Sequence, residues 1–259
     1  MEYKVVKVER KEGGIAVITF NRPDKFNAAS IPLFNDLCAA VEELDADQEI
    51  GCIILTGQTI THPRKGTPFA CFSAGADITE FGNLGKPEVG YEWIKTCFKP
   101  FKAIEMSETP IIAAVNGVAF GFGFEIAGTC DMIFAAKSAR FALREITHGA
   151  IPAWVVSRGL EKINKQVVAY LALSARELNA EEARRFGIAV DVFEDDMLLP
   201  ECEKLAREIA QRSYMTRTYI KRILNRNAMY DYEATQRIMP AIYATDYHLE
   251  SSARFQTRK

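Results

Sequence analysis

Apolar and polar positions alternate along the first twenty residues of the chain, and this period predicts two strands. Residues 3–9 place an apolar side chain at nearly every second position, and residues 15–20 are apolar at almost every position. Residues 11–14, Lys-Glu-Gly-Gly, supply the glycines of a turn between them. We therefore expect an N-terminal β-hairpin.

The next segment changes to a helical period and then returns to a strand. Ser30 can cap a helix that has Pro32 in its first turn. The apolar face of this helix would hold Leu33, Leu37, Ala40, Val41 and Leu44. Residues 52–55 predict a buried strand that ends at Thr56-Gly57. A strand, a helix and a strand at this spacing indicate a right-handed crossover unit.

A polar stretch at residues 58–71 is expected to be a loop. Its Arg64 and Lys65 are either phosphate contacts on a lid or solvated charges. Small residues follow at 72–78, Phe-Ser-Ala-Gly-Ala-Asp-Ile. They indicate either a close approach to the backbone or a tight turn in which Asp77 caps a helix.

The centre of the chain alternates between strand and helix. Residues 111–115 are apolar and uncharged, which predicts a strand buried on both faces, and a helical run at 126–130 follows a glycine-rich turn. We also expect helices at 88–106, 155–159, 166–173 and 180–186, strands at 132–135 and 188–193, and a loop at 141–152.

From residue 197 onward the pattern is helical, with helices expected at 202–211, 216–229 and 232–247. We therefore predict an α/β core over residues 1–195 and a C-terminal helical part over residues 196–259. Helices that are apolar on more than one face often pack against other subunits.

Composition and charge exclude several classes of protein. A net charge of −2 in 259 residues gives no reason to expect nucleic acid or an anionic membrane as partner. We find no membrane-spanning apolar run and no signal-peptide core, so we expect a cytoplasmic protein with reduced thiols. The six cysteines form no CxxC pair and the three histidines no HExxH, so we expect no metal site.

The glycine-rich turn carries the first candidate chemistry. Gly121 and Gly123 precede a helix whose first N–H groups lack partners, and such a helix start favours negative charge. Glu125 is then either a partner of the helix dipole or a catalytic group. Ile126 replaces the third glycine of a dinucleotide-binding fingerprint, so that motif fails. The sequence contains neither GxxxxGK[ST] nor GxSxG.

Several segments together resemble the crotonase (enoyl-CoA hydratase/isomerase) superfamily. In the order of that family, they are residues 21–28, 72–77, 110–117 with Glu125 and Cys130-Asp131, and 180–187 with the strand that follows. The resemblance implies a repeated ββα spiral core and a C-terminal helical part that forms trimers or dimers of trimers. It also implies an acyl-CoA substrate and no cofactor apart from the coenzyme A of that substrate.

The resemblance also assigns roles to residues. The backbone N–H groups of Ala76 and Phe122 match the pair that binds the thioester oxygen, and Glu125 and Glu145 match the two glutamates that flank the water in hydratases. Coenzyme A and the substrate would meet Lys25, Phe26, Ala74, Asp77, Ile78 and Thr79. Isomerases usually keep only the glutamate that matches Glu145, so the presence of both favours a hydratase of fatty acid metabolism.

Alternatives to this assignment stay open. One is a Δ3,Δ2-enoyl-CoA isomerase or a related thioester lyase; another is a non-catalytic relative that binds RNA or a protein. Taken alone, Glu125 is more often a dipole partner and Glu145 a surface residue. His148 is expected to be a loop or packing residue. Phe120, Phe122 and Phe124 line either the acyl pocket or the core.

Three departures from the family pattern indicate a specialised acyl group. Phe122 stands where relatives usually have glycine, so its ring points either away from the acyl pocket or into it. Arg144 stands where many hydratases have proline. If it lies beside Glu145 it lowers the pKa of that carboxyl; alternatively, it contacts an acidic or oxygenated acyl group. The stretch at 58–71 is also longer than the usual connection.

Overall fold

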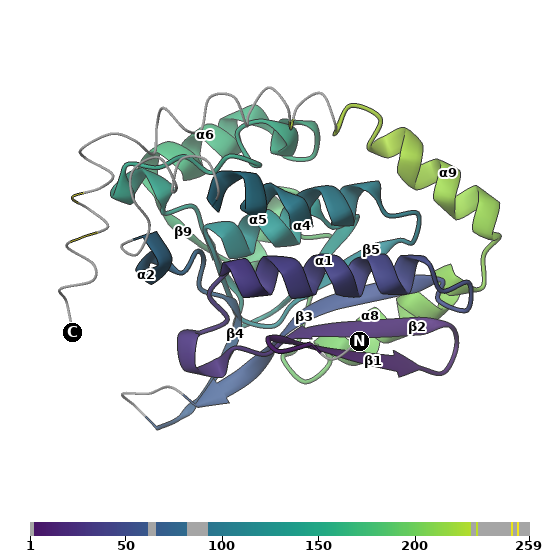
Figure 1. The fold of residues 1–259 in the computed structure, drawn as a ribbon. Coiled ribbons are helices and arrows are strands. Elements are labelled where there is room, and N and C mark those ends of the chain that lie inside the picture. Colours follow the sequence, from purple (N-terminus) through teal and green to yellow (C-terminus); the bar gives the residue numbers. More distant parts are fainter. Residues whose placement is uncertain are drawn as a thin grey trace.

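The computed structural model describes residues 3–61, 66–81 and 93–228, together with 232, 250 and 253. Its described strands form a ten-stranded sheet with two wings that share one long strand (Figure 1). The first wing opens with the expected hairpin of β1 (Val6–Lys11) and β2 (Ile15–Phe20). Four further strands follow in parallel: β3 (Cys52–Thr61), β5 (Ile111–Val115), β7 (Met132–Ala136) and β10 (Asp191–Phe193). Here β2 pairs with β3, β3 with β5, β5 with β7, and β7 with β10.

The second wing begins where β3 leaves the first. The far end of β3 pairs antiparallel with β4 (Pro68–Ser73). Parallel pairing adds β6 (Val118–Phe120) and β8 (Arg140–Ala142), and β9 (Glu177–Asn179) closes the edge. Three times in succession, with β3 and β4, β5 and β6, and β7 and β8, the chain places one strand in each wing before a helical segment, which is the repeated ββα spiral that the resemblance implied.

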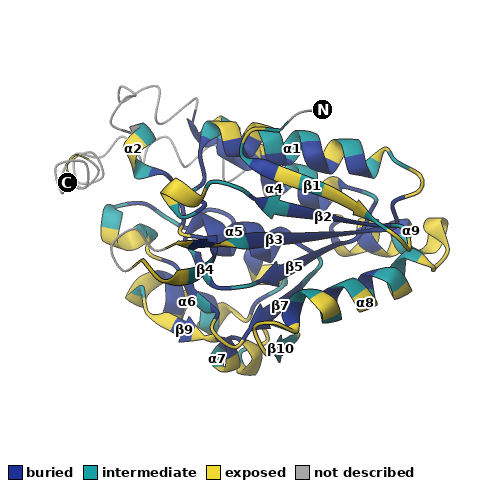
Figure 2. Cartoon of the chain, turned by 90° about the horizontal axis from the view of Figure 1, so that it is seen from below, coloured by how far each residue is buried: buried dark blue, intermediate teal, exposed yellow. Residues whose placement is uncertain are grey.

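Helices cover both faces of the first wing. Figure 1 shows α1 (Ile31–Asp45), α4 (Ile94–Met106) and α5 (Phe122–Thr129) on one side and α8 (Leu198–Ala210) on the other. Successive strand residues face opposite sides: Ile53 packs in the α1 layer, and Ile54 packs against α8. The centre of the sheet is accordingly buried on both faces (Figure 2), which is why its sequence is continuously apolar.

Local sequence explains α1. The Ser30 side chain accepts a hydrogen bond from the Leu33 N–H, 3.3 Å away, and Pro32 occupies the first turn. The five apolar residues predicted for its inner face are all buried, and Phe34 joins them. This helix was predicted correctly from cap to face.

The described C-terminal helices behave differently from one another. The α8 helix buries Leu198, Cys202 and Ala206 against the sheet. The α9 helix (Tyr214–Leu224) buries only Thr218 and Lys221. Its exposed apolar side chains are Tyr214, Met215, Tyr219, Ile220, Ile223 and Leu224. The helix expected at 232–247 lies outside the described residues except for Tyr232, and the division after residue 195 stays a prediction.

The prediction of a loop at residues 58–71 was wrong. The strand predicted at 52–55 continues to Thr61 and turns back as β4, so the stretch is a β-hairpin in the part that the structure describes. Thr59, Ile60 and Thr61 favour a strand through their branched side chains, although two of them are polar. Arg64 and Lys65 lie outside the described residues.

Other differences concern short elements. Residues 155–159 were predicted to be helical, but residues 155–157 form turns and the next two residues begin a 3₁₀ helix at Arg158–Glu161. The loop predicted at 141–152 contains the end of β8 and a 3₁₀ helix, η3 (Glu145–His148). The helix predicted at 88–106 is described from Ile94. Strands as short as β6 and β9 give no measurable period, so the sequence did not reveal them.

The helices α6 (Lys165–Ser174) and α7 (Ala180–Arg185) agree with the predictions, and Gly187 follows α7 in the left-handed conformation with φ of 72°. The sequence left open whether Asp77 caps a helix, and the short helix α2 (Ile78–Phe81) follows it. None of the helices in the described ranges is long and apolar enough to cross a membrane.

Candidate active site

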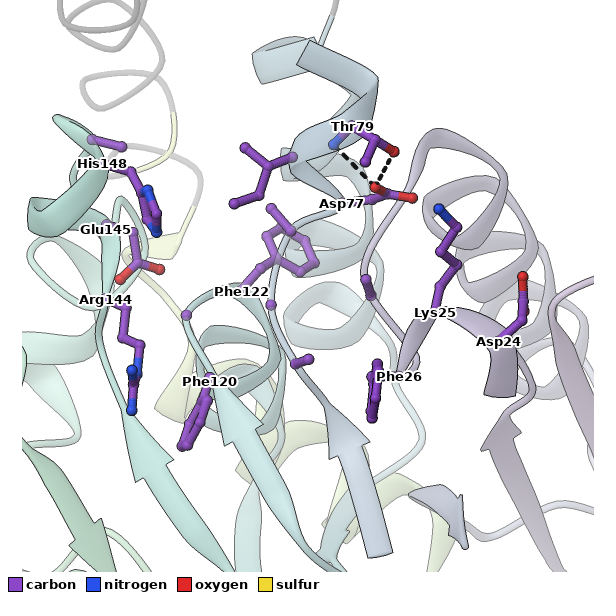
Figure 3. Close-up of a pocket in the computed structure, with 17 residues that line it drawn as sticks. Asp24, Lys25, Phe26, Asp77, Thr79, Phe120, Phe122, Arg144, Glu145 and His148 are labelled. Atoms are coloured by element: carbon purple, nitrogen blue, oxygen red, sulfur yellow. Dashed lines mark hydrogen bonds between the residues drawn. The ribbon is translucent and has the colours of Figure 1, made fainter. Parts of the chain in front are cut away.

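Four segments that are distant in sequence meet around one cavity of about 510 Å³ (Figure 3). They are the loop after β2, the turn between β4 and α2, the turn between β6 and α5, and the start of η3. Ten of the site residues predicted from the sequence line this cavity: Lys25, Phe26, Ala74, Ala76, Asp77, Ile78, Thr79, Phe122, Arg144 and Glu145. Phe120, which the sequence left open between the acyl pocket and the core, also lines the cavity. The other lining residues were not predicted as site residues: Asp24, Ala28, Gly75, Gly121, His148 and Ala150.

A buried asparagine shapes the first of these segments. Asn27 is fully buried with φ of 54°, and its side-chain oxygen accepts a hydrogen bond from the Arg22 N–H at 3.0 Å. Its amide nitrogen donates to the Cys71 carbonyl at 2.8 Å. Asparagine tolerates the left-handed conformation and can satisfy the backbone at the same time. These bonds fix the loop that presents Lys25 and Phe26 to the cavity.

Asp77 lines the cavity, but its carboxylate is already engaged. It accepts hydrogen bonds from the N–H of Thr79 at 3.1 Å and from the Thr79 hydroxyl at 2.5 Å, and it forms an ion pair with Arg22 at 2.7 Å. Burial raises the pKa of Asp77, but these bonds from Thr79 and Arg22 outweigh it and hold that pKa below its usual value. Asp77 therefore caps α2 and ties it to the loop after β2.

The two backbone N–H groups predicted to bind an oxyanion both belong to cavity-lining residues. Around Ala76, the Gly75 carbonyl and the Asp77 N–H bond to Ala29, each at 2.7 Å. This pairing points the N–H of Ala76 itself away from Ala29. Phe122 is the first residue of α5, where an N–H has no intrahelical partner. Within the described residues, neither N–H has a hydrogen-bond acceptor.

Gly121 brings the α5 turn close to Glu145. Its φ is 50°, and a Cβ at this position would lie 2.8 Å from Glu145 Oε1. Only glycine provides both this conformation and this space. The glycine-rich turn thus has a second use that the sequence did not reveal: it leaves room for a carboxylate.

Glu145 projects into the cavity from the first position of η3 (Figure 3). Its Oε2 is buried and accepts no hydrogen bond from any residue in the described ranges. Burial raises the pKa of Glu145 to about 7, although the nearby backbone N–H groups of Glu145 and Arg144 oppose this shift. A carboxyl group that titrates near neutrality is suited to proton transfer at physiological pH.

Glu125 lies beneath the cavity surface and is not among the residues that line it. The side chain is buried on α5, and its Oε1 accepts hydrogen bonds from the backbone N–H of Trp154 at 2.7 Å and of Val155 at 3.3 Å. Burial, and then the charge of Glu145, raise its pKa well above the usual value. The two carboxyl groups are therefore electrostatic neighbours that cannot both ionise easily.

The Arg144 guanidinium does not lie beside Glu145, so the first of its two possible roles, lowering the pKa of that carboxyl, does not apply. Its guanidinium forms an ion pair with Glu177 at 3.2 Å and lies 4.6 Å from the ring centre of Phe120. Figure 3 shows the side chain running away from Glu145. The pKa of Glu145 is raised, whereas an adjacent Arg144 was expected to lower it.

The three phenylalanines of the turn lie in different places. Phe120 and Phe122 line the cavity, while Phe124 packs in the core against Phe141, with ring centres 5.5 Å apart. His148 also lines the cavity, above Glu145 in Figure 3. Burial and then the charge of Arg144 lower its pKa. His148 was predicted to be a loop or packing residue, and its place in the cavity lining was not predicted.

The backbone donors to Glu125 were also missed. Trp154 and Val155 act through main-chain N–H groups, which no side-chain pattern reveals. Among the residues that the structure describes, no cluster of three or more His, Cys, Asp or Glu side chains could hold a metal ion. The six cysteines are all free thiols.

Comparison with known proteins agrees with this geometry. Residues 10–254 match the family model for enoyl-CoA hydratase/isomerase. The chain belongs to this family. A probable enoyl-CoA hydratase of Mycobacterium leprae is 32% identical to this hydratase/isomerase family member over 98% of the chain and 96% of the relative. The short-chain-enoyl-CoA hydratase of Clostridium acetobutylicum is 32% identical over 89% and 85%.

A solved structure extends the likeness to the fold. The enoyl-CoA hydratase/isomerase from Pseudoalteromonas atlantica superimposes with a TM-score of 0.81 at 30% identity, covering 99% of this chain and 98% of the other. The predicted crotonase-like fold is thereby confirmed, and membership of this family supports a coenzyme A thioester as substrate.

Proposed function

We propose that this hydratase/isomerase family member is an enoyl-CoA hydratase that adds water across the 2,3 double bond of an enoyl-CoA thioester. The observation that carries the proposal is the pair Glu125 and Glu145. Both are carboxyl groups with raised pKa values, and the charge of Glu145 helps to raise the pKa of Glu125. Glu145 lines the cavity beside the predicted oxyanion donors, and Glu125 lies on the same helix as Phe122. A surface glutamate or a simple dipole partner would not need this environment.

The thioester oxygen binds to the N–H groups of Ala76 and Phe122. When water adds to the β-carbon, negative charge moves onto this oxygen in an enolate-like transition state. Donors fixed at a helix start and a tight turn stabilise that charge without reorganising, and each such donor typically contributes about 3 kcal/mol. The bonds from Gly75 and Asp77 to Ala29 hold one of these donors in place.

The two glutamates then transfer the protons. One carboxylate takes a proton from the water as its oxygen bonds to the β-carbon, and the other carboxyl gives a proton to the α-carbon as the enolate collapses. The product gains one water in total, and the pair ends with the same number of protons. Because the charges of Glu125 and Glu145 repel, the pair favours the singly protonated state that this exchange requires.

The other end of the cavity binds coenzyme A. Lys25 and Phe26 lie across the cavity from Glu145 (Figure 3), where a lysine can meet a phosphate and a ring can meet the adenine. Ala74, Ile78 and Thr79 line the passage between the two ends. The Asp77 carboxylate acts through the loop that it fixes, by its bonds to Thr79 and Arg22.

The assembly is a homotrimer or a dimer of trimers in the cytoplasm. The exposed apolar side chains of α9 support an association between copies, because a monomer rarely leaves such a surface in water. Neither nucleic acid nor a membrane is a partner in this proposal, and the reaction uses no metal or redox cofactor.

An ultraviolet assay with crotonyl-CoA tests the proposal, run beside Glu125→Gln and Glu145→Gln. We expect hydration by the wild type and a loss of at least about 100-fold in kcat/KM for each variant. Mass spectrometry in ¹⁸O-labelled water separates hydration, which incorporates the label, from isomerisation, which does not. Conversion of a 3-enoyl-CoA with only Glu145→Gln inactive would instead identify an isomerase.

A further inference from the structure

The ring of Phe122 separates the cavity from a closed group of aromatic side chains. Its ring centre lies 4.8 Å from that of Phe101, stacked at 24°, and 4.9 Å from that of Phe34. Trp93 contacts the same ring with centres 6.4 Å apart. Phe122 is itself only 5% exposed, and it contributes to the cavity lining at the same time. One side of the ring therefore faces the site and the other side faces the core.

This ring cannot move aside easily. Phe34 and Phe101 are fully buried on α1 and α4, and Trp93 is 2% exposed. Protein interiors are close-packed, so a new position for the Phe122 ring would need space that the core does not contain. The contact between these helices and α5 thus makes the ring a fixed wall.

The wall lies where an acyl chain would extend. The N–H of Phe122 binds the thioester oxygen in the proposed function, so the acyl carbons begin close to its Cβ. Lys25 lies on one side of Phe122 and Glu145 on the other (Figure 3). The coenzyme A portion occupies the Lys25 side, and the acyl group has to pass the ring.

We propose that Phe122 limits the length of the acyl group, so that this enzyme accepts short enoyl-CoAs such as crotonyl-CoA and excludes long straight chains. The inference rests on the proposed function and adds the substrate class to it. Phe101 supports the ring from behind and is a positioning residue for this selection.

The test is a chain-length series of kcat/KM over crotonyl-, hexenoyl-, octenoyl- and decenoyl-CoA. In the wild type we expect kcat/KM to fall by at least about 100-fold from crotonyl- to decenoyl-CoA, because one misplaced methylene alone costs about 10-fold or more. Phe122→Leu and Phe101→Leu, which enlarge the space at the ring and behind it, should reduce this ratio to below about 10-fold.

Phe124→Leu is the matched control. This phenylalanine lies on the same helix and is fully buried, but it packs against Phe141 and does not line the cavity. It should lose similar stability and keep the wild-type ratio. A merely structural role of Phe122 would leave the ratio unchanged in every variant.

Two results would overturn the inference. One is a wild type that hydrates decenoyl-CoA nearly as fast as crotonyl-CoA; the other is a Phe122→Leu ratio equal to that of the wild type. Titration calorimetry with butyryl-CoA and decanoyl-CoA gives the same comparison without turnover. If no enoyl-CoA reacts, the proposed function fails, while the two binding constants still decide the length limit.

Discussion

The carboxylate of Glu145 lies against the bare Cα of Gly121, so close that a Cβ there would meet Oε1 at 2.8 Å. We predict that Gly121→Ala displaces this carboxylate and lowers kcat by at least about 100-fold, because catalysis depends on placing the proton-transfer group within hydrogen-bond reach. The left-handed φ of 50° adds about 1 kcal/mol of instability. Steady-state kinetics and urea unfolding measure the two effects.

Gly187→Ala is the control for the strain alone. Gly187 has φ of 72°, and a Cβ added there would meet no neighbouring atom within 4 Å, so alanine should cost similar stability without changing kcat. Equal kcat losses in both variants would mean that the Gly121 effect comes from destabilisation and not from Glu145.

The raised pKa of Glu145 predicts how stability depends on pH. Burial raises this pKa from 4.5 to about 7, so the folded state binds a proton more tightly than the unfolded state does. The resulting stabilisation is complete below about pH 4.5 and is lost as the pH rises through about 7. We expect this group to contribute a decrease of up to about 3 kcal/mol in the free energy of unfolding. The pKa of Glu125 shifts in the same direction, so this group adds to the decrease.

Urea unfolding of the wild type and of Glu145→Gln between pH 5 and pH 8 checks this predicted pH dependence of stability. The neutral amide cannot ionise, so the variant should show a flatter dependence on pH and gain stability relative to the wild type as the pH rises. Identical slopes for the two proteins would show that Glu145 titrates near its ordinary value in the folded state.

Lys162 holds the far end of the helix that carries Glu125. Its Nζ donates hydrogen bonds to the carbonyls of Gly128, Thr129 and Cys130, each at 3.1 Å, which places a positive charge at the C-terminus of α5. We predict that Lys162→Met lowers the free energy of unfolding by about 2 kcal/mol.

Lys165→Met provides the comparison for Lys162. Lys165 begins α6 and is exposed, so its replacement should change stability by less than about 0.5 kcal/mol. Thermal and urea unfolding of both variants give the measurement. A Lys162 variant as stable as the Lys165 variant would refute the helix-clamping role.

Arg144 is predicted to act independently of Glu145. Its guanidinium is engaged by Glu177 and by the Phe120 ring, so Arg144→Ala should leave the apparent pKa near 7 in the pH profile of kcat/KM unchanged. Arg144→Lys serves as the charge-conserving comparison. A higher apparent pKa in the alanine variant alone would show that Arg144 stabilises the ionised carboxylate after all.

The local sequence pattern was sufficient to predict an element when the element is long or begins with a recognisable capping residue. The Ser30 cap and the apolar face of α1 are found where the sequence placed them, and so is the uncharged strand β5. The residues at 58–71 show the opposite case. Their polarity indicated a loop, but hydrogen bonds between two distant ends of the stretch make a hairpin, and single-sequence polarity carries no information on that pairing.

The sequence by itself determined the segments that form the site, through the spacing of Ala76, Phe122, Glu125 and Glu145 and their likeness to one family. Only the tertiary structure decided how these groups act on one another. It separated Arg144 from Glu145, placed Glu125 beneath the cavity on the N–H groups of Trp154 and Val155, and packed Phe122 against Phe101. The physical reason is that burial, pKa and the shape of a cavity depend on which side chains from other elements come within a few ångströms, and that proximity is created by folding.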